Sequence, residues 1–83
     1  MDTEFAFWAR ITQLKQFLVV TFQLRQVPDH IVNPFDVRIE FNAIRWNDAF
    51  LEELQIKTGL ASIKWSVAPL SSRTVKVVLW IPK

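Results

Sequence analysis

Few side chains in this chain are of a type that could carry out chemistry. His30 is the only histidine, and it would act as a general base only beside a nucleophile or an orienting carboxylate. Asp29 is its sequence neighbour, but adjacent residues do not generally converge on one reacting atom. Ser71 and Ser72 closely follow Pro69 and are typical of a turn. We therefore predict no catalytic site around these residues.

Carboxylates and phosphate-binding loops offer no alternative chemistry. Glu52 and Glu53 are adjacent in an expected helix, so their carboxylates point about 100° apart. Gly59 is the only glycine, which excludes a glycine-rich phosphate loop. The chain contains no cysteine, which excludes disulfides, thiolate metal sites and cysteine nucleophiles. The sequence predicts a protein that is not an enzyme and that has no cofactor, metal or small-molecule substrate.

Positive charge is concentrated in the last part of the chain. The net charge of the whole chain is +2. After Glu53 there is no acidic residue, and the basic residues there are Lys57, Lys64, Arg73, Lys76 and Lys83. Such an asymmetry can steer an anionic partner toward this part of the protein.

The apolar content is high for the length. The 83 residues are enough for one domain, which we place over residues 1–83. Apolar residues make up 51% of the chain and include four Trp and seven Phe. In so short a chain, some of these side chains should stay exposed or be covered by a partner. This surplus predicts association with a second copy or with another protein.

The sequence gives no indication of a membrane or exported protein. No unbroken apolar run approaches the ~20 residues that span a bilayer. The first residues include Asp2 and Glu4 and lack the basic stretch of a signal peptide. We expect a cytoplasmic location and no membrane partner.

The best-defined expected element is a helix over residues 47–58. Asn47 or Asp48 can cap its N-terminus, because a short side-chain oxygen accepts hydrogen bonds from free backbone N–H groups. Gly59 fits the left-handed position that commonly follows the last turn of a helix. One apolar stripe along this helix comprises Phe50, Leu51 and Leu54.

Four segments alternate between apolar and polar residues with the period of a β-strand. They are residues 18–25, 35–43, 63–67 and 75–81. Two prolines, Pro28 and Pro34, mark residues 27–34 as a loop. The last two strands, joined by the turn at residues 69–72, are expected to form a hairpin.

The first sixteen residues fit two patterns. Phe7, Ile11 and Leu14 follow helical spacing, whereas Phe5, Phe7 and Ala9 alternate as in a strand. We favour a helix, because a hairpin into the following strand would lack a turn residue. A strand stays open as the alternative for residues 4–16.

These elements together predict a single small α+β domain. Its order is α-β-β-α-β-β, with a four-stranded, mainly antiparallel sheet. The helix over residues 47–58 packs on one face of this sheet, and an N-terminal helix completes the fold.

The surplus of apolar residues leads to our main functional hypothesis. If each strand turns one face to the core, four apolar residues lie on the other face: Phe17, Val19, Val78 and Trp80. Exposed aromatic and aliphatic groups on a sheet favour symmetric pairing or a protein ligand. We therefore predict a protein-interaction or assembly module that forms homo-oligomers.

Nucleic-acid binding is the alternative hypothesis. Lys64, Lys76 and Trp80 share the solvent face of the expected hairpin, Arg73 lies in its turn region, and Arg38 joins them if its strand is a neighbour. Basic side chains around an exposed aromatic ring suit a single strand, because they supply phosphate contacts and base stacking.

A helix-turn-helix is a further alternative for DNA binding. Gly59 would then lie in the turn and residues 61–70 would form the second helix. The alternating run from Ile63 to Val67 and the position of Pro69 argue against this interpretation.

Overall fold

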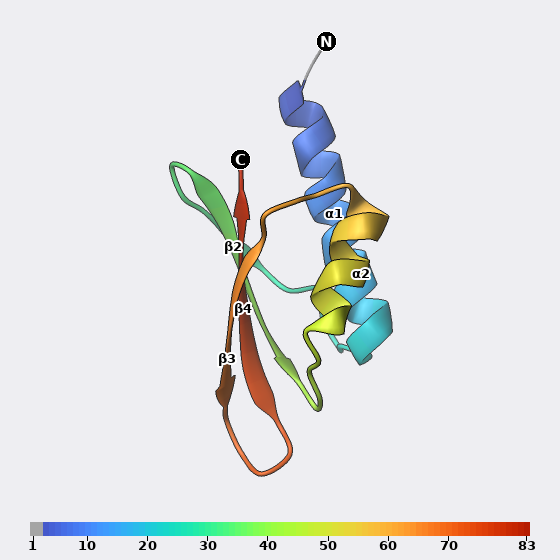
Figure 1. The fold of residues 1–83 in the computed structure, drawn as a ribbon, viewed down its shortest axis with the longest axis vertical. Coiled ribbons are helices and arrows are strands. Elements are labelled where there is room, and N and C mark those ends of the chain that lie inside the picture. Colours follow the sequence, from blue (N-terminus) through green and yellow to red (C-terminus); the bar gives the residue numbers. More distant parts are fainter. Residues whose placement is uncertain (1–2) are drawn as a thin grey trace.

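The computed structural model describes residues 3–83 as two helices and a four-stranded sheet (Figure 1). The elements are α1 (Thr3–Phe22), β1 (His30–Val32), β2 (Asp36–Ala43), α2 (Ala49–Thr58), β3 (Lys64–Pro69) and β4 (Val75–Pro82). The predicted order α-β-β-α-β-β is confirmed, as is the α+β class.

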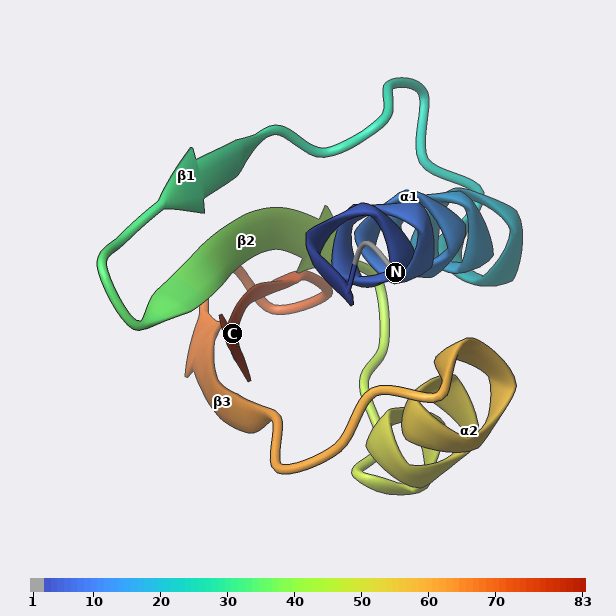
Figure 2. The ribbon, with the colours of Figure 1, turned by 90° about the horizontal axis from the view of Figure 1, so that it is seen from above.

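The sheet has the strand order β1-β2-β4-β3, and every neighbouring pair is antiparallel. The central strands are therefore β2 and β4, while β1 and β3 form the two edges. Both helices lie on the same face of the curved sheet, and the other face carries no helix (Figure 2). This one-sided arrangement leaves an open sheet face and an edge strand as the surfaces of interest.

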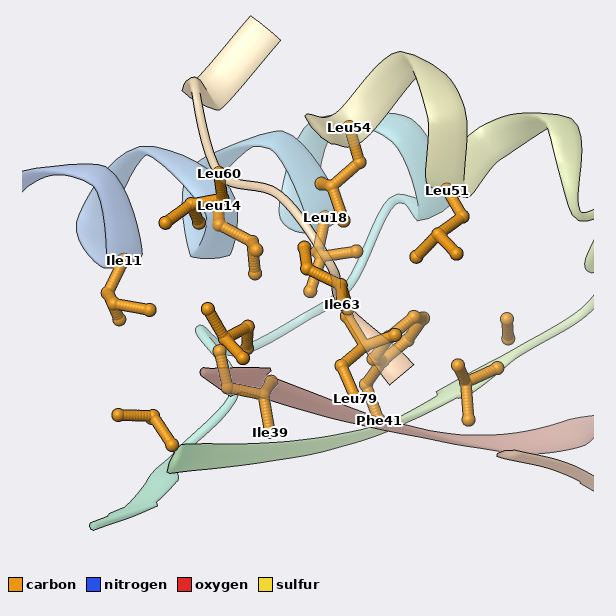
Figure 3. Packing of buried hydrophobic residues seen from close by; sticks show 14 residues of the cluster. Ile11, Leu14, Leu18, Ile39, Phe41, Leu51, Leu54, Leu60, Ile63 and Leu79 are labelled. Carbon is orange, nitrogen blue, oxygen red and sulfur yellow. The ribbon is translucent and has the colours of Figure 1, made fainter. Parts of the chain in front are cut away.

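The hydrophobic core lies between the helices and the sheet (Figure 3). From α1, the buried residues Ile11, Leu14 and Leu18 recur at spacings of three and four, which places them on one side of the helix. Leu51 and Leu54 of α2 are also buried. The central strands contribute alternate residues, which are Val37, Ile39, Phe41, Ala43, Val77, Leu79 and Ile81.

The predicted strand over residues 18–25 is wrong, because α1 continues to Phe22. Leu18 extends the apolar side of α1 and is buried, whereas Val20 is 78% exposed. The helix ends at Phe22 and is followed by Gln23, whose φ is +53°, and the N–H of Leu24 donates to the C=O of Val19. The predicted N-terminal helix is confirmed and is longer than expected.

The first strand of the sheet lies inside the segment predicted to be a loop, which is a second correction. β1 consists of three exposed residues and pairs with β2 from Val37 to Ile39. Since neither face of β1 is buried, its sequence lacks the apolar alternation by which strands are recognised. Backbone pairing with β2 defines this strand, and Pro28 and Pro34 lie outside it.

The predicted helix end at Gly59 is confirmed. Gly59 has φ +72°, and its N–H donates to the C=O of Gln55 over 2.9 Å. At the other end of α2, the Asn47 side-chain oxygen accepts from the N–H of Ala49 over 2.9 Å. Because β3 follows as a strand, the helix-turn-helix alternative is wrong.

Replacing Gly59 with alanine should lower the free energy of unfolding by about 1 kcal/mol. A Cβ at this position would lie 3.5 Å from the Arg10 side chain, an ordinary contact, so the loss comes from the positive φ. Urea denaturation measures the change. Gly59→Asn is the control and should lose less, because asparagine adopts this conformation more readily. If Gly59→Ala were as stable as the wild type, the helix would not end at Gly59.

Candidate functional site

Three of the predicted nucleic-acid-binding residues lie in one row across the open face. Trp80 of β4 pairs with Arg38 of β2 on one side and with Lys64 of β3 on the other. Side chains directly opposite each other share a face, and the backbones of β2 and β3 are about 10 Å apart across β4. We call Arg38, Trp80 and Lys64 the basic–aromatic row.

A carboxylate lies beside this row. Glu40 contacts the Nζ of Lys76 at 2.7 Å and the Nη2 of Arg38 at 3.1 Å. The hydrogen bond from Lys76 is the main reason that the pKa of Glu40 lies below its ordinary value, and the charges of Lys76 and Arg38 act in the same direction. Glu40 therefore stays ionised and partly neutralises two of the basic groups. Within residues 3–83, no acidic side chain forms an ion pair with Lys64.

The other two predicted basic residues lie away from the row. Lys76 is four residues before Trp80 on β4 and lies directly opposite Asn42. Arg73 is exposed in the turn between β3 and β4, where its N–H donates to the Ser71 hydroxyl. At ~3.4 Å per strand residue, Arg73 is on the order of 20 Å from Trp80. The structure thus brings together Arg38, Lys64 and Trp80 but not Arg73.

A small pocket of about 110 Å³ opens beside Trp80 and Lys64 of the row. Its lining residues are Phe35, Asp36, Ser62, Lys64, Trp80 and Pro82. We call it the Trp80 pocket. Sequence reasoning missed Phe35, which alternation placed in the core but which precedes β2 and is 86% exposed. It also missed Ser62, since only the strand pairing reveals its proximity to Trp80.

The four predicted protein-contact residues do not form one surface. Phe17 and Val19 belong to α1, on the helical side of the sheet, because the strand on which they were placed does not exist. The Phe17 ring packs against the core and lies 5.5 Å from the Nζ of Lys57. Val78 and Trp80 lie on the open face, as predicted from their alternation with Val77 and Leu79.

Val78 is only 7% exposed although no helix covers it. It lies directly opposite Glu40 on one side and Ser66 on the other. Long charged side chains cover apolar surface with their methylene groups while their charged ends stay in water. Glu40 lies directly opposite Val78 and forms ion pairs with Arg38 and Lys76, and we attribute the low exposure of Val78 to these long side chains. Val78 is therefore part of the folded surface and offers little area to a partner.

The edge strand β3 is exposed along its whole length, since all six of its residues are exposed. It is the longer of the two exposed edge strands, because β1 has only three residues. Trp65 and Val67 lie opposite buried residues of β4 and face the helical side, yet they are 42% and 39% exposed. Figure 1 shows that the turn end of the β3–β4 hairpin projects beyond the ends of both helices.

The Trp65 side chain is nevertheless fixed in place. Its Nε1 donates to the Oδ1 of Asp48 over 3.2 Å, and the Nε1 of Trp46 donates to the same oxygen over 2.9 Å. Asp48 precedes α2, so these bonds connect the edge strand to the start of that helix. Trp65 thus presents a positioned ring beside a free strand edge.

The opposite edge of the sheet is less accessible to another strand. β1 has only three residues, and short edge strands limit pairing with other chains. Pro28 and Pro34 on either side cannot donate backbone hydrogen bonds. The free edge of β3 is therefore the better site for adding a strand.

Comparison with known proteins gives no further information about these surfaces. No known protein family, curated protein or solved structure matches the chain. Within residues 3–83, neither helix is long and apolar enough to cross a membrane. His30 contacts the Trp8 ring and the Nζ of Lys15.

Proposed function

We propose that this protein is a non-catalytic assembly module that self-associates through the free edge of β3. The observation that carries the proposal is the exposure of all six residues of this strand. An edge strand presents unpaired N–H and C=O groups, and proteins usually protect such edges with charges, prolines or a covering segment. In β3 a charge and a proline occur only at the ends, as Lys64 and Pro69, and the residues between them carry neither.

A second copy of β3 is the partner that fits this edge best. A two-fold axis perpendicular to the sheet pairs the strand with itself in antiparallel orientation. With Ser66 opposite the partner's Ser66, Trp65 lies opposite the partner's Val67, an aromatic–aliphatic pair of the kind that stabilises sheets. Lys64 then lies opposite the partner's Ala68, so like charges do not meet.

The neighbouring register is less favourable. If Val67 lay on the two-fold axis, Trp65 would be opposite the partner's Pro69. Proline lacks the N–H that a strand pair uses, so this register loses a backbone hydrogen bond. We therefore place Ser66 at the centre of the dimer.

A charge-exchange experiment tests this dimer. We expect the wild-type chain to dimerise at micromolar concentration in sedimentation equilibrium. Ser66→Lys and Ser66→Glu each place like charges opposite each other at the axis and should weaken dimerisation about fivefold. An equimolar mixture of the two variants should restore association, because opposite charges then face each other. Ser66 is exposed, so the fold of each variant should be unchanged.

Ser72→Lys is the matched control, because it adds the same charge in the exposed hairpin turn. It should dimerise as the wild type does. A wild-type chain that sediments as a monomer at every concentration would contradict self-association. If Ser66→Lys dimerised as strongly as the wild type, β3 would not be part of the interface.

A further inference from the structure

The basic–aromatic row on the open face combines cations with an aromatic ring, and pairing of two β3 edges does not explain this combination. Arg38 and Lys64 flank Trp80 on adjacent strands, and Lys64 and Trp80 also line the Trp80 pocket. The exposed ring of Phe35 lines the same pocket. Two aromatic rings and two cations are thus gathered at one end of a sheet face that no helix covers.

We infer that the basic–aromatic row binds single-stranded nucleic acid, with a base against Trp80 and phosphates at Lys64 and Arg38. Trp80 is half-buried, and the accessible part of its ring can stack on any base, because every base has a π-face. Lys64 and Arg38 lie on either side of the ring, where the backbone of a stacked nucleotide would pass. Lys64 belongs to β3, but its side chain shares the open face with Trp80, whereas the dimer pairs the backbone at the free edge. The inference therefore does not depend on dimerisation.

The polar groups of the Trp80 pocket suit a base better than a phosphate. Asp36 lines this pocket, and its Oδ1 accepts a hydrogen bond from the Nδ2 of Asn33 over 2.8 Å. A fixed carboxylate repels a phosphate but accepts hydrogen bonds from the amino groups of a base edge. Ser62 adds a hydroxyl that donates or accepts. The base is therefore assigned to the Trp80 pocket, and the phosphates are assigned to Lys64 and Arg38.

The aromatic surface also distinguishes a nucleic acid from an acidic peptide. An acidic peptide would pair with Lys64 and Arg38 but would leave the ring faces of Trp80 and Phe35 without a stacking partner. A single strand uses both kinds of group at once, as non-specific single-strand binding sites do. We therefore assign the row to nucleic acid and use an acidic peptide as a test.

Glu40 limits the affinity of this site. Its carboxylate holds Lys76 and Arg38 in ion pairs and adds a negative charge to the same face. A phosphate must compete with Glu40 for Arg38. Removing the Glu40 charge should therefore strengthen binding, which is the opposite of what most surface substitutions do.

The experiment measures fluorescence anisotropy of a fluorescein-labelled oligodeoxycytidylate about a dozen nucleotides long, at low salt. Wild-type protein should bind, and its affinity should fall as the salt concentration rises. In a plot of log K against log salt concentration, each phosphate contacted should add about −0.7 to the slope. Glu40→Gln should bind several-fold more tightly. Glu53→Gln is the matched control, since it removes the same charge from an ion pair on α2, and its affinity should equal that of the wild type apart from the general change in net charge.

Two further variants test the ring and the lysine. Trp80→Leu should weaken binding about fivefold or more, because it removes base stacking, whereas Trp65→Leu on the other face should have little effect. Lys64 is exposed, so Lys64→Gln should not affect the fold. It should weaken binding and reduce the dependence of affinity on salt. No anisotropy change at low salt, or equal effects of Glu40→Gln and Glu53→Gln, would overturn the inference. Equal binding of a labelled oligoglutamate would overturn it in favour of an acidic protein partner.

Discussion

Replacing Leu18 with alanine should lower the free energy of unfolding by about 3 kcal/mol. Leu18 is 1% exposed and packs between α1 and the sheet with Leu14 and Ile39 (Figure 3). The substitution removes three buried carbon atoms and leaves a cavity that the surrounding core fills only in part. Urea denaturation followed by far-ultraviolet circular dichroism measures the loss.

Val20→Ala is the informative control for this prediction. Val20 lies two residues further along α1 and is 78% exposed, so the change should be within about 0.5 kcal/mol of zero. It could raise stability slightly, because alanine is a better helix former than valine. If residues 18–25 were a strand, Leu18 and Val20 would share one face and both substitutions would be costly. Equal losses would therefore contradict the helix.

The parts of the fold that the sequence predicts correctly are those where local preference and tertiary packing agree. The region of α2 has a polar start, a buried stripe containing Leu51 and Leu54, and Gly59 at its end. Residues 36–43 alternate cleanly because β2 is a central strand with one face on the core. In the other central strand, β4, the core residues Val77, Leu79 and Ile81 also alternate, although Val78 between them is buried too. In each case a single strong pattern reflects one buried face.

The predictions fail where the local pattern and the tertiary structure diverge. Val19, Val20 and Thr21 are β-branched and favour a strand, and Leu18, Val20 and Phe22 alternate with other residues. Packing of Leu18 against the sheet overrides this preference, so the segment stays helical. The prediction for β1 fails for the opposite reason. Its three residues are all exposed, so the sequence contains no pattern that indicates a strand.

The candidate surfaces were predictable to different degrees. Lys64 and Trp80 belong to one hairpin, so alternation alone places them on the same face. Arg38 joins them only because β2 is adjacent to β4, which depends on the order of strands in the sheet. The exposed edge of β3 depends on the same order. The order of strands in the sheet is not encoded in a short stretch of sequence.

A single cysteine at position 66 should link two copies of this protein covalently. The chain has no cysteine, so a disulfide in Ser66→Cys would join two protomers. Residues opposite each other in an antiparallel pair have Cα atoms about 4.5–5.5 Å apart, within the roughly 4.4–6.8 Å of a disulfide. Mild oxidation with copper–phenanthroline should give a dimer on a non-reducing gel at micromolar protein concentration.

Ala68→Cys reports the register of the same contact. With Ser66 on the axis, the two copies of residue 68 lie about 14 Å apart along the strands, too far for a disulfide. This variant should stay monomeric on the gel. If Val67 lay on the axis instead, residue 66 would face the partner's residue 68, and only a mixture of the two variants would cross-link. Failure of every combination to cross-link would contradict pairing through β3, whatever the cause of association.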